Sequence, residues 1–481
     1  MRMLIGDERA AGDGGTYPVV NPATEEVVGE APEATTDQVC AAAEAAAAAF
    51  PAWSRTPPTQ RAELLDRLGD LVRDHLDELV PLVQAETGST LRVAQTMQVP
   101  TTVERFRRYA KGALEPTVAP LAPVPFPSTA LAPAALLGAV AARQPVGVVA
   151  CITPYNFPLV NMAGKVGPAL AMGNTVVVKP APQDPLAVLR FGDLVVEAGF
   201  PPGVVNIVSG SGAEAGEALV GSGDVDMVSF TGSTAVGQRI GQVAGHDMKR
   251  LLMELGGKGA GIVFDDADLG TTIGGLASAW AFHSGQICTA PTRVLAQRGI
   301  HDKVVAGLTQ AAGQLTVGDP LDPRTVVGPV VSAAQRDRIE GYILQGAEEG
   351  GSVVAGGERP AIERGFYVAP TLIVDAKPDM RVVREEIFGP VVVVVPFDDE
   401  DEAIALANDT PYGLNDYVFT GDATRGMRVA QQLRSGSVAI NTVQQHPEAP
   451  FGGFKLSGVG RDRGSYGLLA YSEIQSIVWP A

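Results

Sequence analysis

The chain has 481 residues, of which 46% are hydrophobic and 19% are charged, a mixture typical of a large α/β protein with two or three domains. Its 54 acidic and 36 basic residues give a net charge of −18 without a basic stripe, which argues against nucleic acid as a partner. Three cysteines without C-x-x-C spacing and five scattered histidines argue against a disulfide framework and a metal site. The first ten residues lack the apolar core of a signal peptide, so we expect a reducing, cytoplasmic setting.

The first part of the chain predicts helices that cover a sheet. Residues 4–30 contain the short apolar runs and turn residues of strands at a sheet edge. Apolar residues then recur at helical spacing over residues 37–49, 60–86 and 99–110, and we expect Pro81 to kink or divide the second of these helices.

An apolar segment rich in alanine and proline follows at residues 118–142. Five prolines interrupt it, which argues against a membrane-spanning helix. We therefore expect a surface arm or interdomain crossover that packs on a partner.

Four continuous apolar runs then alternate with helical segments. The runs are residues 146–152, 174–180, 204–208 and 227–230, and the helices between them cover residues 162–172, 185–198 and 213–221. This alternation predicts a doubly wound parallel sheet, which binds ligands at the carboxyl ends of its strands. Gly232 and Ser233 begin the next helix, where free N–H groups favour phosphate, although Ser233 is equally well explained as an ordinary helix cap.

A second α/β domain begins near Leu255. Strands are expected at residues 261–264, 292–296, 314–317, 371–374, 391–397 and 474–479, and helices at residues 268–283, 302–312, 333–349, 400–408 and 424–433.

Four polar residues lie where these elements end. Cys288 follows a Gly-Gln pair among small and polar neighbours, Asn156 lies in the loop after the first buried strand, and Glu254 lies between apolar residues and glycines. A nucleophilic thiol needs an oxyanion donor such as Asn156 and a base such as Glu254, whose pKa burial would raise. Lys179, at the end of the second strand, is placed to reach a ribose or phosphate. Each residue alone also has a plain structural explanation, so this reasoning reaches a nucleotide-binding α/β enzyme with a candidate catalytic thiol.

Seven motifs in the same order make the sequence similar to the aldehyde dehydrogenase superfamily along nearly its whole length. They begin at Thr153, Val178, Phe230, Glu254, Gly285, Glu385 and Pro450 and read TPYNFP, VKP, FTGSTAVG, ELGGK, GQICTA, EEIFGP and PFGGFKLSG. The spacing of 34 residues between Glu254 and Cys288 is also typical of the superfamily.

The resemblance implies the oxidation of an aldehyde to its carboxylic acid with NAD or NADP. Cys288 would form a thiohemiacetal and then a thioester, Asn156 would hold the oxyanion, Glu254 would activate water, and Lys165 would lie near the active site. The implied cofactor contacts are Ile152, Thr153, Pro154, Lys179, Pro182, Gly212, Gly232, Ser233, Glu386 and Phe388. Pro182 stands where members that prefer NAD often carry a glutamate, so the choice between NAD and NADP stays open.

The implied substrate pocket contains Tyr155, Phe157, Asn161, Gly164, Phe282, Ile287, Thr289 and Phe451. Gly164 replaces the Trp or Arg of many members, which predicts a roomier tunnel and argues against a carboxylate tail on the substrate. The aromatic wall predicts medium or aromatic aldehydes.

Three functional divisions are expected. A cofactor domain covers residues 1–117 and 142–253, a catalytic domain covers residues 254–446, and residues 447–459 are a linking segment that lines the site. The loop at residues 442–450 is a further candidate to face the substrate. Residues 118–141 and 460–481 form an oligomerisation arm and C-terminal strand, which predicts a homodimer or homotetramer. A CoA-acylating relative and a catalytically silent ligand-binding member are the alternatives, and the intact Glu254 and Cys288 argue against them.

Overall fold

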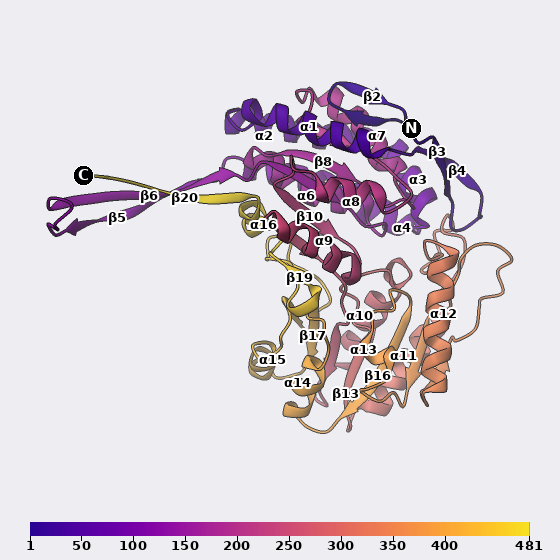
Figure 1. The fold of residues 1–481 in the computed structure, drawn as a ribbon. Coiled ribbons are helices and arrows are strands. Elements are labelled where there is room, and N and C mark those ends of the chain that lie inside the picture. Colours follow the sequence, from indigo (N-terminus) through magenta and orange to yellow (C-terminus); the bar gives the residue numbers. More distant parts are fainter. Residues whose placement is uncertain (481) are drawn as a thin grey trace.

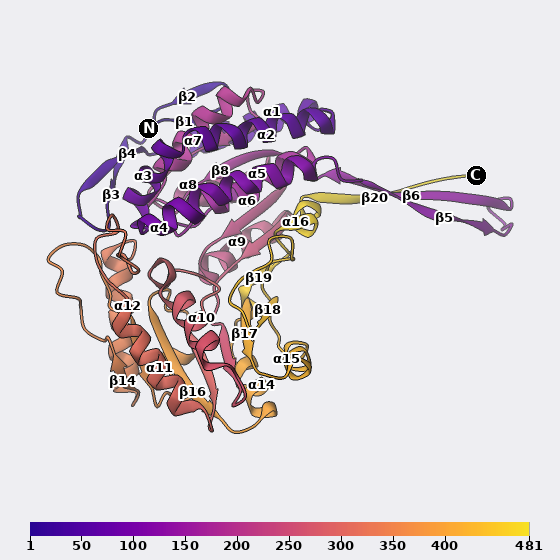
Figure 2. The same cartoon turned by 180° about the vertical axis from the view of Figure 1, so that it is seen from behind.

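The computed structural model describes residues 1–480 and contains two α/β units and a projecting arm (Figure 1). The view from behind shows the two units stacked on each other, with the arm leaving the N-terminal unit to one side (Figure 2). Within residues 1–480, the structure has no helix with the length and apolarity needed to cross a membrane.

The N-terminal unit is built on an eight-stranded sheet with five parallel strands at its centre. Its strand order is β19 (Gly458–Val459), β11 (Arg250–Glu254), β10 (Met227–Thr231), β7 (Val148–Ile152), β8 (Thr175–Lys179), β9 (Val205–Ile207), β1 (Met3–Ile5) and β2 (Glu8–Ala10). The chain runs outward from β7 to β9 and then returns to the other side of β7 as β10 and β11. The strand order therefore reverses between β7 and β10, where open α/β sheets bind ligands, and the predicted doubly wound sheet is confirmed.

Helices cover both faces of this sheet. They are α1 (Thr36–Trp53), α2 (Pro58–Asp74), α3 (Leu76–Thr87), α4 (Leu91–Val93), α5 (Val99–Gly112), α6 (Pro158–Met172), α7 (Leu186–Ala198), α8 (Glu214–Gly221) and α9 (Thr234–His246), and a hairpin of β3 (Thr16–Val20) and β4 (Val27–Pro32) lies beside them. Thr35 begins α1 with a capping box in which its side chain accepts from the Gln38 backbone N–H. The expected break in the second helix falls at His75, whereas Pro81 lies inside α3.

The C-terminal unit is built on a seven-stranded sheet. Its order is β14 (Ser352–Ala355), β15 (Thr371–Val374), β16 (Val391–Phe397), β13 (Arg293–Gln297), β12 (Ala260–Val263), β17 (Asn415–Phe419) and β18 (Ser437–Ile440), and its helices are α10 (Leu269–Ala281), α11 (His301–Gln314), α12 (Ala333–Glu348), α13 (Arg381–Arg384), α14 (Glu400–Asn408) and α15 (Ala423–Ala430). The strand expected at residues 314–317 is wrong, because α11 continues to Gln314 and Val317 makes only an isolated bridge with Val327.

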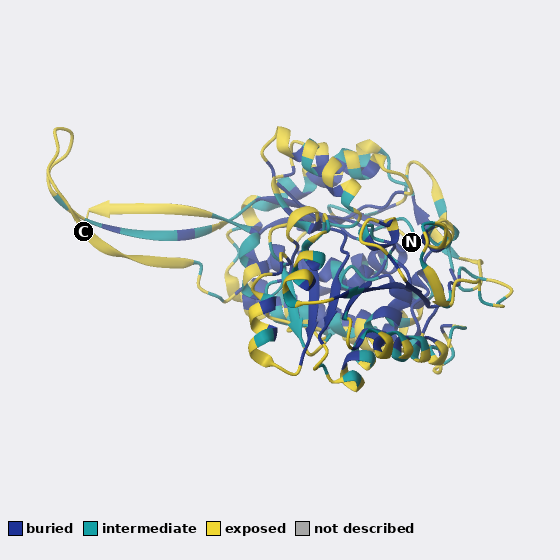
Figure 3. Ribbon diagram, turned by 90° about the horizontal axis from the view of Figure 1, so that it is seen from below, coloured by how far each residue is buried: buried dark blue, intermediate teal, exposed yellow. Residues whose placement is uncertain are grey.

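The arm is a three-stranded antiparallel sheet. Strands β5 (Val118–Phe126) and β6 (Ala135–Pro145) form a hairpin, and β20 (Ser472–Pro480) pairs with β6 along nine residues. The arm is largely exposed (Figure 3). The preceding helix α16 (Gly464–Ala470) packs instead on α5 and α6, with Leu468 and Tyr471 in the core, so the C-terminal part of the arm begins at Ser472 rather than at residue 460.

Candidate active site

A cavity of about 1800 Å³ lies between the two units. The loop Thr153–Phe157 enters it from the carboxyl end of β7, and Gly232 and Ser233 enter it from the carboxyl end of β10. Glu254 ends β11, and Cys288 reaches the cavity from the C-terminal unit. The reversal in strand order thus places residues that are distant in sequence around one space.

The loop that carries Cys288 is held in an unusual conformation. Helix α10 ends at Ala281, and His283, Ser284 and Gly285 then adopt positive φ angles of 47°, 57° and 73°. Only glycine fits at position 285, because a Cβ there would lie 2.2 Å from the Gly389 carbonyl carbon. Non-glycine residues at positive φ are costly and persist only where their surroundings hold them, which is a common property of active sites.

Two side-chain hydrogen bonds fix this loop to the C-terminal unit. Ser284 Oγ donates to the Gly328 carbonyl oxygen at 2.8 Å, and Gln286 Oε1 accepts from the Val331 N–H at 3.0 Å. Both side chains are buried, so the loop is rigid where it presents Cys288.

Cys288 is half-buried and faces the cavity. Burial, together with the nearby carboxylates of Glu386 and Glu254, raises the pKa of its thiol to about 12. The guanidinium of Arg463 acts in the opposite direction. The thiol is therefore protonated at neutral pH and needs a base before it can attack a carbonyl carbon.

Glu254 is a buried carboxyl group at the edge of the same cavity. Burial raises its pKa well above the usual value, and Asp462 raises it further, whereas Lys165, Arg463 and Arg461 lower it. Among the described residues, neither carboxylate oxygen has a hydrogen-bond partner. An unpaired carboxylate with a raised pKa is suited to accept a proton near neutral pH.

Asn156 supplies a fixed amide. Its Nδ2 donates to the Gln286 carbonyl oxygen at 2.8 Å, and its own backbone carbonyl accepts from Gln98 Nε2 at 3.0 Å. Since an amide nitrogen carries two hydrogens, one N–H remains for a ligand. The bond to Gln286 also ties Asn156 to the loop that carries Cys288.

Lys165 lies behind the cavity wall. It is fully buried on α6, and its Nζ donates to Ser229 Oγ at 3.2 Å, which in turn lies 2.8 Å from Tyr471 Oη. Burial lowers its pKa. The sequence grouped Lys165 with the catalytic residues, but the structure does not bring its ammonium group to the cavity surface.

All ten predicted cofactor contacts line the cavity. Burial lowers the pKa of Lys179 to about 8, and burial raises that of Glu386 to about 7. Glu386 Oε1 accepts from the Gly257 N–H at 2.9 Å, and Ser233 caps α9 by accepting from the Val236 N–H. Thr153 Oγ1 is buried and has no hydrogen-bond partner among the described residues. Cationic, carboxylate and hydroxyl groups around the start of a helix fit the phosphates and riboses of a dinucleotide.

Aromatic rings also line the cavity. Phe157 stacks on Phe282 at a centroid distance of 6.2 Å, and its ring lies 5.1 Å from that of His283. Tyr155 meets Phe388 edge to face at 5.8 Å. Seven of the eight predicted pocket residues line the cavity, with Gly164 as the exception.

Gly164 is covered by an arginine from α5. A Cβ at Gly164 would lie 1.9 Å from Arg105 Nη1, so the guanidinium occupies the place of the missing side chain. The roomier tunnel expected at this glycine is therefore not present, and the argument from Gly164 against a carboxylate tail also fails.

Several lining residues were not predicted from the sequence. They are Arg105 and Arg108 on α5, Tyr417 on β17 and Arg463 before α16. Gln444, Gln445 and Glu448 also line the cavity, and they lie in the loop at residues 442–450 that the sequence indicated as a candidate to face the substrate.

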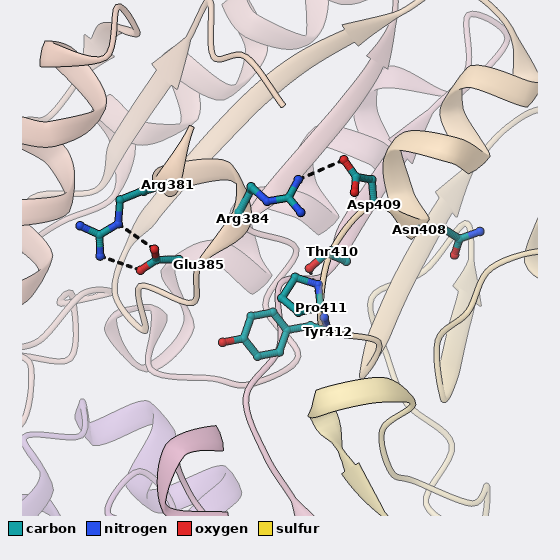
Figure 4. A pocket seen from close by; sticks show the side chains of 8 residues that line it. All are labelled: Arg381, Arg384, Glu385, Asn408, Asp409, Thr410, Pro411 and Tyr412. Atoms are coloured by element: carbon teal, nitrogen blue, oxygen red, sulfur yellow. Dashed lines mark hydrogen bonds and ion pairs between the residues drawn. The ribbon is translucent and has the colours of Figure 1, made fainter. Parts of the chain in front are cut away.

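A smaller pocket opens elsewhere on the C-terminal unit (Figure 4). It is lined by Arg381, Arg384, Glu385, Asn408, Asp409, Thr410, Pro411 and Tyr412. Its arginines are already paired, since Arg381 lies 2.7 Å from Glu385 and Arg384 lies 3.1 Å from Asp409. The chemistry of the molecule is therefore concentrated in the large cavity.

Comparisons with known proteins agree with this geometry. The chain is 41% identical to the betaine aldehyde dehydrogenase of Cereibacter sphaeroides, covering 96% of this chain and 94% of the relative, and 39% identical to the phenylacetaldehyde dehydrogenase of Pseudomonas fluorescens, covering 99% and 95%. An NAD+ complex of an aldehyde dehydrogenase from Bacillus cereus matches the structure with a TM-score of 0.93 and 41% identity over 100% of this chain and 96% of that one. The profile of the Aldehyde dehydrogenase family matches residues 9–477. The chain belongs to the aldehyde dehydrogenase family, and it is an enzyme that oxidises an aldehyde with a nicotinamide dinucleotide.

Proposed function

We propose that Cys288 is the nucleophile of this reaction, Glu254 its base and Asn156 its oxyanion donor. The observation that supports these roles is that all three side chains meet in one cavity, which the predicted cofactor contacts also line. The thiol has a raised pKa and a carboxyl group with a raised pKa lies close enough to affect it, so a donor and an acceptor of the proton are both present.

The residues act in two stages. Glu254 accepts the thiol proton as Cys288 Sγ bonds to the carbonyl carbon, and the carbonyl π electrons move to oxygen. The oxyanion accepts hydrogen bonds from Asn156 Nδ2 and from the Cys288 backbone N–H. A bound nicotinamide dinucleotide supplies the hydride acceptor that brings the carbon to the acyl oxidation level.

Hydrolysis of the thioester completes the cycle. After the first proton has passed from Glu254 to solvent, the Glu254 carboxylate removes a proton from water while the water oxygen bonds to the acyl carbon. The C–S bond then breaks to release the acid and the Cys288 thiolate, and Glu254 gives up its second proton to the thiolate or to solvent. The same oxyanion donors serve this second addition. Lys165 acts as a positioning residue, because it is buried outside the cavity lining and its charge lowers the pKa of Glu254.

The first test is an aldehyde screen that follows the absorbance of the reduced cofactor, with NAD and NADP in parallel. We expect turnover in the wild type, none in Cys288→Ala and wild-type turnover in Cys40→Ala, because Cys40 lies on α1 away from the cavity. Wild-type rates in Cys288→Ala would disprove the thiol mechanism.

We further propose that residues 1–117 and 142–253 bind the cofactor, that residues 254–446 carry the nucleophile, and that the arm joins subunits. The arm exposes apolar side chains in a single chain, among them Val118, Leu121, Ile474 and Trp479, and Leu131 at its tip is 98% exposed. Such a surface is stabilised when a second copy covers it. We expect a dimer or tetramer by light scattering, and a loss of assembly when residues 472–481 are deleted. A monomeric mass for the intact chain would contradict this.

All three cysteines are free, which supports a reducing compartment such as the cytoplasm.

A further inference from the structure

We propose that the aldehyde substrate carries a carboxylate, and that Arg105 and Arg463 bind this carboxylate. The inference rests on the proposed function, because it assigns the far end of the substrate whose aldehyde carbon meets Cys288. Both guanidinium groups line the cavity, from α5 and from the segment before α16.

Arg463 is fixed in place but has unused hydrogen-bond donors. Its guanidinium lies over the Phe451 ring at 4.1 Å, and Nη1 donates to Gln445 Oε1 at 2.6 Å. This is the only hydrogen bond from its guanidinium group to the described residues. A guanidinium has five N–H donors, so most of them remain available. Burial and the neighbouring cation of Arg105 lower the pKa of Arg463.

Arg105 is similar. Its Nη1 donates to the Val160 carbonyl oxygen at 2.8 Å, and its side chain lies over Gly164. Within residues 1–480, neither Arg105 nor Arg463 has a carboxylate oxygen within 4.0 Å. A cation held in a cavity without a partner is costly, and a bound carboxylate would provide that partner in a planar, two-pronged geometry.

A neighbouring arginine of the same helix is paired with carboxylates, in contrast to Arg105 and Arg463. Arg108 lies on the same wall, 2.7 Å from Glu448 and 3.0 Å from Glu115. The arginines of the smaller pocket in Figure 4 are paired as well. Asp462 is the carboxylate beside Arg105 and Arg463, and it instead accepts from the backbone N–H of Arg463 at 2.7 Å.

The wall that leads to these residues is cationic in an acidic protein. Helix α5 carries Arg105, Arg107, Arg108 and Lys111 against the single acid Glu104, whereas the whole chain has a net charge of −18. All five side chains line the cavity. This charge favours the entry of anionic aldehydes and disfavours aldehydes with a quaternary ammonium group.

The test compares charged and uncharged aldehydes of the same shape. The probes are ω-oxo acids of three to six carbons and their methyl esters, with butanal as a reference and betaine aldehyde as the cationic probe. In the wild type we expect kcat/KM for the preferred acid to exceed that for its ester by about tenfold or more, since hydrogen bonds to a charged group are worth about this factor.

Arg463→Gln and Arg105→Gln should each reduce this acid-to-ester ratio by about tenfold, mainly through KM, with circular dichroism used to check that the variants fold. Arg73→Gln is the matched control, because Arg73 lies on α2 outside the cavity and is ion-paired with Asp70 and Asp74, and its ratio should stay within about threefold of wild type. The proposal would be overturned if the wild type used the esters as well as the acids, or if the acid-to-ester ratio were unchanged in both variants. An equal loss for acid and ester with a shifted pH profile would show that Arg463 acts on the thiol instead. If butanal and every other aldehyde fail to react, the proposed function itself is wrong.

Discussion

Replacing Glu254 by Gln is the sharpest test of the proposed chemistry. The two side chains have nearly the same shape, and both carboxylate oxygens of Glu254 lack hydrogen-bond partners among the described residues, so the substitution breaks no hydrogen bond. The amide cannot accept a proton. Hydrolysis of the thioester should therefore slow while the fold is retained.

The size of the effect follows from the role of a general base. Such groups contribute about 10²- to 10⁴-fold, which corresponds to about 3–5 kcal/mol of activation free energy. The pH dependence of kcat provides a second test, because its direction follows from the raised pKa. Because the pKa of Glu254 is raised, kcat in the wild type should rise with pH as Glu254 loses its proton, in a range well above the usual carboxyl value. The variant should lack this rise.

The assay is stopped-flow absorbance of the reduced cofactor. For Glu254→Gln at alkaline pH, where the Cys288 thiol ionises more readily, we expect a burst of about one equivalent per active site followed by slow turnover. Mass spectrometry of the quenched enzyme should find the acyl group on Cys288. Steady turnover at the wild-type rate would refute the assignment of Glu254.

Three further changes test other parts of the structure. Arg293→Met should lower the free energy of unfolding by about 3–5 kcal/mol in urea titrations, because three backbone carbonyls lose the buried guanidinium at 2.9 Å; a loss below about 1 kcal/mol would contradict this. Gly285→Ala should lower the free energy of unfolding by about 1–2 kcal/mol through the positive φ alone, and it should also reduce kcat. Unchanged kinetics would show that the loop tolerates a Cβ. Pro182→Glu should raise KM for NADP about tenfold relative to NAD, because a carboxylate repels a 2′-phosphate; equal changes for both cofactors would place Pro182 away from the ribose.

The sequence predicted the features that depend on local pattern. Strands β7 and β8 are buried at every position, and their continuous apolar runs identified them. The residues at strand ends were also predictable, because parallel strands bring their carboxyl ends to one edge. Asn156 and Glu254 are brought together for this reason.

Features that depend on contacts between distant elements were not predictable. Gly164 indicated an open space, but Arg105 from another helix fills it. The helix break was placed at Pro81, whereas His75 ends α2 and α3 begins at Leu76, so the proline removes a single intrahelical hydrogen bond. Neither outcome is contained in the local sequence.

Burial of Cys288 and Glu254 raises two pKa values without opposing the proton transfer between them. Before transfer the pair is a thiol and a carboxylate, and afterwards it is a thiolate and a carboxylic acid, so one negative charge is present in both states. Burial penalises that charge in either place, and only the difference between the two sites affects the transfer. The cation of Arg463 favours the charged form of both groups. A pair buried together can therefore exchange a proton at neutral pH, although the thiol alone would remain protonated.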